Sequence, residues 1–558
     1  MPARRLPALI PGLAAVALLF AHTALWRGER ELSQLRTPRR YWEDVGIASS
    51  AFHRGARAPS PPPIVIGVGP GPELRRAYQR FVSRAAEEAG IRPWQFWRTV
   101  PIRPALAVQH LVHRPSDDGG RAALLTFGYR VLGGVSPWLG LWLGALLGAP
   151  VLLWLCWELA AAGRGAAGAL LALAVACSPY SVEMLSLPYS AVGFYWVGLL
   201  ALVPVGAATL VAPPPTRTGL WVRALAAGLV LAVATLCRSG TLLLFPAFAL
   251  VLAIGALRAA PARARAVDAG GRRPAAGLRA LAPALANAGV AVALLVLPYA
   301  VAREPRHHYA WPGIWEGLGD FDRSKGHTWY DPAAREALRR AGVEVPRWMQ
   351  GPEFETPETA AVFRGLVLQH VREDPLWYLG ILLQRLIATV AQSKLWPRAA
   401  VDGASMAPST SPNEGVIDVY YRLTTTADTL GAGNLRVELP LPLLAAPAWV
   451  LLLLWAAGAR VPALRSARER LGPGLALLLL LAAAALAQPV LVTTASGLET
   501  EAFVLVYGLA AGLALDLALQ RRPGTGRLLQ DGTRLFQDGT RRVLLADHER
   551  TLSEDGHL

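Results

Sequence analysis

Charged residues are scarce in this sequence. They make up 17% of its 558 residues, whereas hydrophobic residues make up 53%. Soluble domains usually carry about 25% charged residues. The deficit argues against a soluble protein of this length, and the long apolar runs that replace the missing charge decide its class.

Acidic residues are also fewer than basic ones. The chain has 39 Asp and Glu residues against 55 Lys and Arg residues, which gives a formal net charge of +16. In a soluble protein this excess would suggest nucleic-acid binding. Here the cations stand in short loops between apolar runs, as the positive-inside rule describes for membrane proteins. We therefore expect membrane lipid, and no nucleic acid, as a partner.

Cysteine is nearly absent. Cys156, Cys177 and Cys237 lie in or at the ends of apolar runs, and no CxxC pair occurs. Neither a disulfide framework nor a zinc site is indicated. These three residues are typical of small buried hydrophobes.

The apolar runs are long enough to cross a membrane, since a helix needs about 20 apolar residues to span a bilayer core about 30 Å thick. Clear examples are residues 137–159, 187–212, 281–302, 439–457 and 474–492. These runs, which are the expected spans, are nearly free of charged residues. The sequence predicts an all-α polytopic membrane protein with about ten transmembrane helices and two large extracytoplasmic loops.

The distribution of cations orders these helices across a cell (inner or plasma) membrane. Arg4 and Arg5 precede the first apolar stretch, which lacks a small-x-small cleavage site and is interpreted as a retained helix. Both termini are then expected on the cytoplasmic side. The expected order is a first transmembrane helix at 1–26, a first extracytoplasmic loop at 27–122, transmembrane helices two to seven at 123–302, a second extracytoplasmic loop at 303–436, transmembrane helices eight to ten at 437–519 and a cytoplasmic tail at 520–558.

Residues 376–396, inside the second loop, are apolar but also contain Arg385 and Lys394. A cation in the middle of a span costs about 2.5–3.5 kcal/mol on insertion scales. A crossing here would also move the basic loop around residues 460–470 to the outside. The pattern therefore predicts an amphipathic helix lying at the outer surface.

The first extracytoplasmic loop begins with a pair of acids, Glu43-Asp44. Adjacent carboxylates just beyond a membrane helix could supply a general base. Equally, they could offset the dipole at a helix N-terminus. The apolar and glycine-rich segment at 64–71 resembles a phosphate-binding turn, but Pro70 and Pro72 remove backbone N–H groups that such a turn needs.

Arg238 separates two short apolar helices, expected at 225–236 and 241–257, and is expected at their outer turn. A guanidinium there could form paired hydrogen bonds with a phosphate. The alternative is that its side chain only reaches out to water.

The second extracytoplasmic loop mixes aromatic, acidic and glycine residues between His307 and Asp331. Such a surface suits sugars or lipid headgroups, but a small domain with a Trp-rich core would have the same composition. His307, His308 and His327 match no specific metal motif, so no cofactor is expected and a metal requirement stays open.

Three segments carry a resemblance to a known family. They are the acidic pair Glu43-Asp44 leading into Ala48 and Gly55, the hairpin turn Leu236-Cys237-Arg238-Ser239, and the stretch Trp315-x-Gly317-Leu318-Gly319 with Gly326 and Asp331 after it. In layout and in these segments, the chain resembles the GT-C superfamily of membrane glycosyltransferases, especially bacterial relatives of protein O-mannosyltransferases and of the aminoarabinose transferase of lipid A. It departs from the family in the proline-rich stretch after Gly55.

The resemblance implies an inverting transfer of a sugar from a polyprenyl-phosphate carrier to an extracytoplasmic acceptor. Under it, Asp44 is the catalytic base, with Glu43 as the substitute candidate. Donor phosphate binding falls to Arg238, Lys325 and Arg303. The substrate and acceptor loop contributes His307, His308, Trp311, Trp315 and Asp331.

Two other classes compete with this interpretation. A transporter or lipid flippase usually places ionisable groups or broken helices near the middle of the membrane. The expected spans are nearly free of charge, and the sequence shows no inverted repeat. A non-enzymatic membrane assembly factor would need no pairing of acids and arginines across loops.

The topology makes a direct prediction. Reporter fusions at Gly271 and Gly524 should report the cytoplasm, and a fusion at Gly319 should report the outside, because this assignment collects the basic loops on one side. Paired phosphatase and fluorescent-protein reporters measure the two locations. An outside signal at Gly271 would overturn the topology.

Overall fold

The structure is a computed structural model of the whole chain. It describes residues 6–29, 64–68, 87–88, 90, 111–115, 119–132, 137–178, 185, 191–213, 215–259, 275–302, 310–319, 325, 331–343, 356–392, 428–430, 437–439, 441–492 and 504–520.

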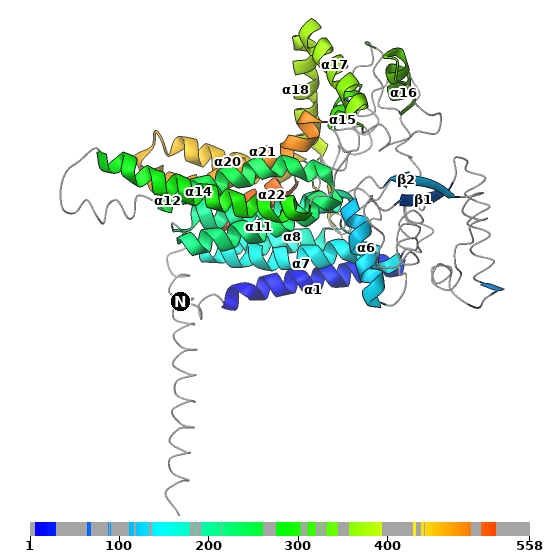
Figure 1. Cartoon of the computed structure of the whole chain (residues 1–558). Helices are drawn as coiled ribbons and strands as arrows, with labels where there is room; N and C mark the ends of the chain where they lie inside the picture. The colour runs from blue at the N-terminus through cyan, green and yellow to red at the C-terminus, as the bar shows by residue number, and fades with distance from the viewer. Residues whose placement is uncertain are drawn as a thin grey trace, which may run out of the picture.

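A bundle of apolar helices forms the body of the molecule, and several of its helices run along a common direction (Figure 1). Leu, Ala and Val favour burial together, and a helix satisfies its own backbone hydrogen bonds, as lipid requires. The bundle contains α1 (Leu6–Glu29), α7 (Pro137–Ala161), α8 (Gly165–Cys177), α10 (Ala191–Gly206), α11 (Arg217–Cys237), α12 (Phe245–Ala259), α14 (Ala275–Ala302), α20 (Leu441–Ala457), α21 (Arg465–Leu491) and α22 (Val504–Gln520).

Six helical stretches in the described part of the chain are long and apolar enough to cross a membrane. They are Trp142–Ala161, Phe194–Val211, Arg217–Cys237, Ser239–Ala259, Ala282–Ala302 and Arg468–Leu491. Shorter apolar stretches occur at Leu9–Ala24, Gly165–Cys177, Pro375–Ile387, Ala445–Ala457 and Leu505–Leu519. The prediction of an all-α membrane protein is therefore confirmed in its coarse form.

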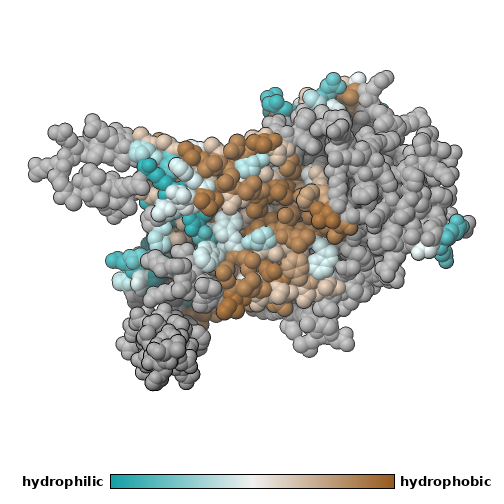
Figure 2. Space-filling model, turned by 60° about the horizontal axis from the view of Figure 1, so that its bottom comes forward, coloured by the Kyte–Doolittle hydropathy of each residue, from teal (hydrophilic) through white to brown (hydrophobic). Residues whose placement is uncertain are grey.

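The outside of the bundle is apolar as well as its core. Figure 2 shows a broad hydrophobic surface with hydrophilic residues gathered at one end of it. Leu229, Leu250 and Leu285 are among the large side chains exposed on this surface. An apolar surface of this extent on a monomer indicates contact with lipid.

Basic residues collect at one end of the bundle because the helices alternate in direction. Arg217 begins α11, Arg258 lies in the last turn of α12, and Arg465 begins α21. The opposite end carries small elements: α6 (Gly119–Leu132), the antiparallel pair β1 (Ile64–Val68) and β2 (Leu111–Pro115), and a helical cluster (Figure 1). A second short antiparallel pair joins β3 (Asp428–Leu430) to β4 (Val437–Leu439). We refer to the two ends as the basic end and the opposite end.

The helical cluster at the opposite end comprises α15 (Ala310–Gly317), α16 (Asp331–Arg340), α17 (Pro357–Glu373) and α18 (Pro375–Gln392). It has its own small core, in which Trp315, Leu318, Leu338 and Phe363 are buried. α17 begins with a capping box, in which the Thr356 side chain accepts from the Thr359 amide at 3.2 Å.

Several helices begin earlier than the sequence predicted. α11 begins at Arg217 rather than at residue 225, α14 at Ala275 rather than 281, and α21 at Arg465 rather than 474. In each case the added residues extend the helix into the basic end. At the start of α11, hydrogen bonds from Trp221 to Asn287 and from Arg223 to Glu158 stabilise helical turns that apolar composition alone does not predict.

The bundle helices approach each other closely at several glycines. A Cβ atom at Gly228 of α11 would lie 2.5 Å from the Leu295 carbonyl oxygen and 2.9 Å from that of Leu294, both in α14. Contacts at that distance are repulsive. Gly228 therefore sets the spacing between α11 and α14.

We predict that Gly228→Leu separates these helices and lowers the yield of folded protein, whereas Gly289→Leu does not. Gly289 lies on α14 itself, and a Cβ there meets nothing within 4 Å, so it controls for the change in helix propensity of about 1 kcal/mol. Size-exclusion profiles and thermal melting in detergent measure the effect. Equal behaviour of the two variants would contradict the assigned packing.

Candidate functional site

Polar groups gather where α11 ends, at the opposite end of the bundle. Arg238 caps α11 in an extended conformation, and its amide donates to the Ala234 carbonyl at 2.7 Å. Ser239 and Gly240 follow, and both residue types weaken a helix. The chain then turns through the short 3₁₀ helix η4 (Ser239–Leu244) into α12. The predicted hairpin with Arg238 at its turn is present, and Arg238 is half-buried there.

The C-terminal end of α21 packs against this turn. A Cβ atom at Gly240 would lie 2.8 Å from the side-chain oxygen of Gln488, so a larger residue there would require the Gln488 side chain to shift. Gln488 is buried. Thr241 is fully buried, and its hydroxyl has no hydrogen-bond partner among the described residues. The turn that follows Arg238 therefore contains a buried hydroxyl and packs against a buried amide.

α6 and α10 close two further sides of the same turn. A Cβ atom at Gly120 of α6 would lie 2.4 Å from Cβ of Leu236, the residue before Cys237. On α10, the Tyr195 hydroxyl donates to the Ala484 carbonyl of α21 at 2.9 Å. We call this convergence of α6, α10, α21 and the Arg238–Thr241 turn the turn site.

The helical cluster joins the bundle beside the turn site, through α18. Arg385 is fully buried, and its Nη1 donates to the Val490 carbonyl of α21 at 3.1 Å. Tyr507 of α22 donates its hydroxyl to the Val390 carbonyl of α18 at 3.0 Å. Val490 is two residues from Gln488, so Arg385 lies close to the turn site in the fold. The sequence identified Arg385 only as a cation unsuited to a span.

Lys325 lies in the helical cluster and is engaged by its neighbours. Its Nζ atom contacts Oδ2 of Asp374 at 2.8 Å and lies 4.3 Å from the centre of the Trp377 ring. The Lys325 side chain and the Trp377 amide donate to the Asp374 carboxylate, and they hold its pKa below the usual value. This contact therefore contributes stability at neutral pH that is lost as the pH falls through the lowered pKa of Asp374.

The two predicted tryptophans of the second loop lie in α15. Trp315 is buried and packs on Phe363, with ring centres 5.2 Å apart. Trp311 is half-buried, with the Arg364 guanidinium 5.9 Å from its ring centre. Trp315 therefore fits the alternative of a Trp-rich core, whereas Trp311 retains an exposed part. Asp331 begins α16.

The remaining predicted site residues lie outside the described residues. They are Glu43, Asp44, Arg303, His307 and His308. The structure therefore does not test whether the acidic pair approaches Arg238, and the pairing stays a prediction.

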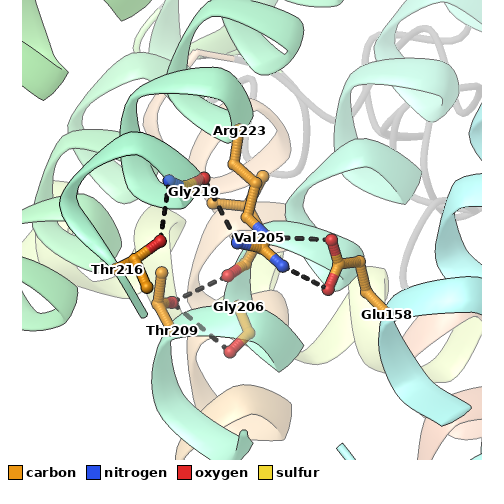
Figure 3. Close-up of polar contacts among 7 residues, drawn as sticks. All are labelled: Glu158, Val205, Gly206, Thr209, Thr216, Gly219 and Arg223. Atoms are coloured by element: carbon orange, nitrogen blue, oxygen red, sulfur yellow. Dashed lines mark hydrogen bonds and ion pairs between the residues drawn. The ribbon is translucent and has the colours of Figure 1, made fainter. Parts of the chain in front are cut away.

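A second polar region lies within the basic end of the bundle (Figure 3). Glu158 of α7 accepts two hydrogen bonds from Arg223 of α11, at 2.8 Å from Nε and 2.9 Å from Nη2. Arg223 also donates to the Gly219 carbonyl at 3.2 Å. The Glu158 side chain is 6% exposed and that of Arg223 is 22% exposed. Two parallel hydrogen bonds between a guanidinium and a carboxylate are the strongest form of this kind of ion pair.

Other buried polar contacts tie the same end together. Asp516 of α22 accepts from the amides of Ala166 and Ala167 at 3.1 and 3.0 Å, and so caps the start of α8. Arg258 donates to the Thr209 carbonyl, and Arg164 donates to the Arg470 carbonyl. Each of the six long apolar stretches still contains an 18-residue window with at most two charged residues, and the charged side chains in these contacts are buried or half-buried and hydrogen-bonded. Glu158 and Asp516 could have been noticed as lone acids in apolar runs, but their partners could not.

Among the described residues, no group of three or more His, Cys, Asp or Glu side chains could hold a metal ion. The turn site offers one cation, an amide and a hydroxyl, which suits an anionic group rather than a metal. The basic end offers charges that neutralise each other.

Comparison with known protein families, with characterised proteins and with solved structures finds no match for this chain. The fold defines the class, a helical membrane protein with a polar turn site at one end. Its function must be argued from the residues.

We predict that Glu158→Gln destabilises the bundle by on the order of 3 kcal/mol, because it leaves the Arg223 guanidinium partly buried without a counter-charge. The control is Glu336→Gln in α16, since Glu336 is half exposed and pairs with Arg340 at the surface, where such pairs contribute little. Thermal unfolding in detergent measures both. A melting temperature for Glu158→Gln equal to that of the control would contradict a structural role for the pair.

Proposed function

We propose that the protein is a membrane glycosyltransferase that moves a sugar from a polyprenyl-phosphate carrier to an extracytoplasmic acceptor, with inversion at the anomeric carbon. In this reaction the acceptor oxygen attacks the anomeric carbon, and the bond from that carbon to the phosphate oxygen breaks. Polyprenyl phosphate leaves with the bonding electrons, and a carboxylate takes the acceptor proton.

The observation that carries the proposal is the position of Arg238. It is half-buried at a helix break, at the end of an apolar bundle opposite its basic end. A lipid carrier keeps its chain among apolar helices and its phosphate at their end. A cation fixed at that level stabilises the negative charge that develops on the leaving phosphate.

The neighbours of Arg238 favour a built site over a chance surface cation. The Gln488 amide and the Thr241 hydroxyl are buried beside the turn, and they supply hydrogen-bonding groups of the kind that phosphate or sugar hydroxyls use. Lys325 pairs with Asp374, so its role at the donor phosphate requires that this contact opens.

The proposed topology has ten crossings and both termini in the cytoplasm of a cell (inner or plasma) membrane. It adds four shorter apolar helices, α1, α8, α20 and α22, to the six long ones. Support comes from the basic residues at one end of the bundle, which the positive-inside rule assigns to the cytoplasm. The turn site then faces outward, where the predicted base, Asp44 or Glu43, also lies.

A lipid or saccharide transporter is the second candidate. The Glu158–Arg223 pair and the π-helical turn η3 (Ala207–Val211) that continues α10 favour it, because buried charges and irregular helices occur along transport paths. The pair lies near helix ends, however, and each charge is satisfied by the other. A transporter would move the lipid-linked sugar without cleaving it.

The decisive experiment uses synthetic polyprenyl-phosphate hexoses in vesicles that contain the full chain. We predict release of polyprenyl phosphate that depends on an acceptor with a free hydroxyl group, because the sugar must move to that oxygen as its bond to the phosphate breaks. Asp44→Asn combined with Glu43→Gln should lower its rate about 10²–10⁴-fold through loss of the base. Arg238→Gln should lower it about 10²–10³-fold through loss of charge stabilisation. Mass spectrometry of the released carrier lipid measures the rate.

Arg340→Gln is the matched control, because Arg340 is an exposed arginine whose contact is an ion pair within α16. It should leave the rate unchanged. Movement of intact lipid-linked sugar between leaflets, with no release, would replace the proposal with the transporter. Full activity of the double variant with Glu43→Gln and Asp44→Asn would show that neither acid is the catalytic base.

A further inference from the structure

The α17–α18 hairpin extends sideways from the opposite end of the bundle. Figure 1 shows α18 running across the direction of the bundle helices. α17 lies on the side of α18 that faces away from the basic end of the bundle. Helices that cross a membrane run along the bundle direction, so α18 has the orientation of a helix that lies in the membrane surface.

The second half of α18 fixes this orientation. Arg385 donates to the Val490 carbonyl, and the Val390 carbonyl accepts from the Tyr507 hydroxyl. Two hydrogen bonds, to the ends of two different bundle helices, hold one end of α18. The first half of α18 contacts α17 and continues away from the bundle (Figure 1).

One face of α18 packs against α17. Ile381 is 1% exposed and belongs to the small core with Phe363 and Val367 of α17, and Trp377 packs against that core. The Trp377 amide also donates to the Asp374 carboxylate at 3.0 Å, which fixes the corner between the two helices.

The opposite face of α18 is apolar and uncovered. Leu376, Leu379, Leu383 and Ile387 are 78%, 59%, 55% and 54% exposed. Their spacing of three and four residues places them on one side of the helix. This stripe lies on the face of α18 opposite α17. Because α17 lies on the side away from the basic end, the stripe faces the same side as the body of the bundle.

The exposed side chains of α17 have the opposite character. Glu358, Arg364, Gln369 and Arg372 are exposed. The hairpin is thus apolar on the side toward the bundle and polar on the side away from it. A membrane that surrounds the bundle meets the hairpin on its apolar side and leaves its polar side in water.

We propose that the α17–α18 hairpin binds the surface of the lipid bilayer, with the stripe of Leu376, Leu379, Leu383 and Ile387 inserted between the lipid headgroups and the first part of the acyl chains. A helix of this kind buries its apolar face about 5–10 Å into that boundary. At 18 residues it lies along about 27 Å of membrane surface. The proposal holds whether or not the protein is a glycosyltransferase.

The test places an environment-sensitive nitrobenzoxadiazole label at Leu379→Cys, in full chain whose native cysteines are replaced, within vesicles of phosphatidylethanolamine and phosphatidylglycerol. The matched control is Gln369→Cys on α17. We expect blue-shifted emission at residue 379 and loss of its fluorescence with lipids spin-labelled near the headgroup. At residue 369 we expect emission typical of water and no quenching.

Three outcomes would overturn the proposal. Equal, water-like emission at both positions would show that the stripe meets no lipid. Stronger quenching at 379 by spin labels near the chain terminus would show that α18 crosses the bilayer. Blue-shifted emission without lipid quenching would assign the stripe to a protein partner, such as a second copy of this chain.

A second measurement keeps the native cysteines and does not depend on folding of the cysteine-free chain. Benzoylphenylalanine at position 379 should crosslink to phospholipid on illumination, and at position 369 it should not. Crosslinks from 379 to protein alone would reject the membrane as the partner.

Discussion

Close contact between helix backbones is the constraint on which the bundle depends. Lipid removes the hydrophobic force between helices that water provides, so packing and hydrogen bonds must hold them together. At Gly228, Gly120 and Gly512, a Cβ atom would lie within 2.7 Å of an atom of a neighbouring helix. These three positions join α11 to α14, α6 to α11, and α22 to α8. Larger residues there would separate these helices, and at Gly120 they would also disturb the turn site, because Gly120 contacts Leu236 at the end of α11.

The two ends of the bundle use polar groups differently. At the basic end, charges meet charges or backbone groups: Glu158 with Arg223, and Asp516 with the first amides of α8. At the opposite end, Arg238 stands at a helix break, and the turn that follows it contains the buried Thr241 hydroxyl and packs against the buried Gln488 amide. The first arrangement stabilises helix packing, whereas the second is the basis of the proposed phosphate site.

The sequence predicted the helical class and the hairpin at Arg238, because apolar runs and their interruptions are local features. It set the start of α11 eight residues late, since Arg217 and Arg223 suggested a loop. Arg223 is helical because Glu158, 65 residues earlier, neutralises it, and no local pattern reports such a partner. From the sequence, Trp315 could be a substrate contact or a core residue. In the structure it packs on Phe363, which comes 48 residues later, and so belongs to the core. For Glu43 and Asp44, the interpretation still rests on sequence.

The cap on α8 links the beginning of the bundle to its end. Asp516 lies 350 residues after Ala166 and accepts a hydrogen bond from the Ala166 amide. The helix that it caps, α8, has only 13 residues. During synthesis, α8 is made long before this partner exists. Val490 and Tyr507, which hold α18, also come from α21 and the start of α22. Assembly of both ends of the bundle is therefore completed only when α21 and α22 have been synthesised and have joined the helices made before them.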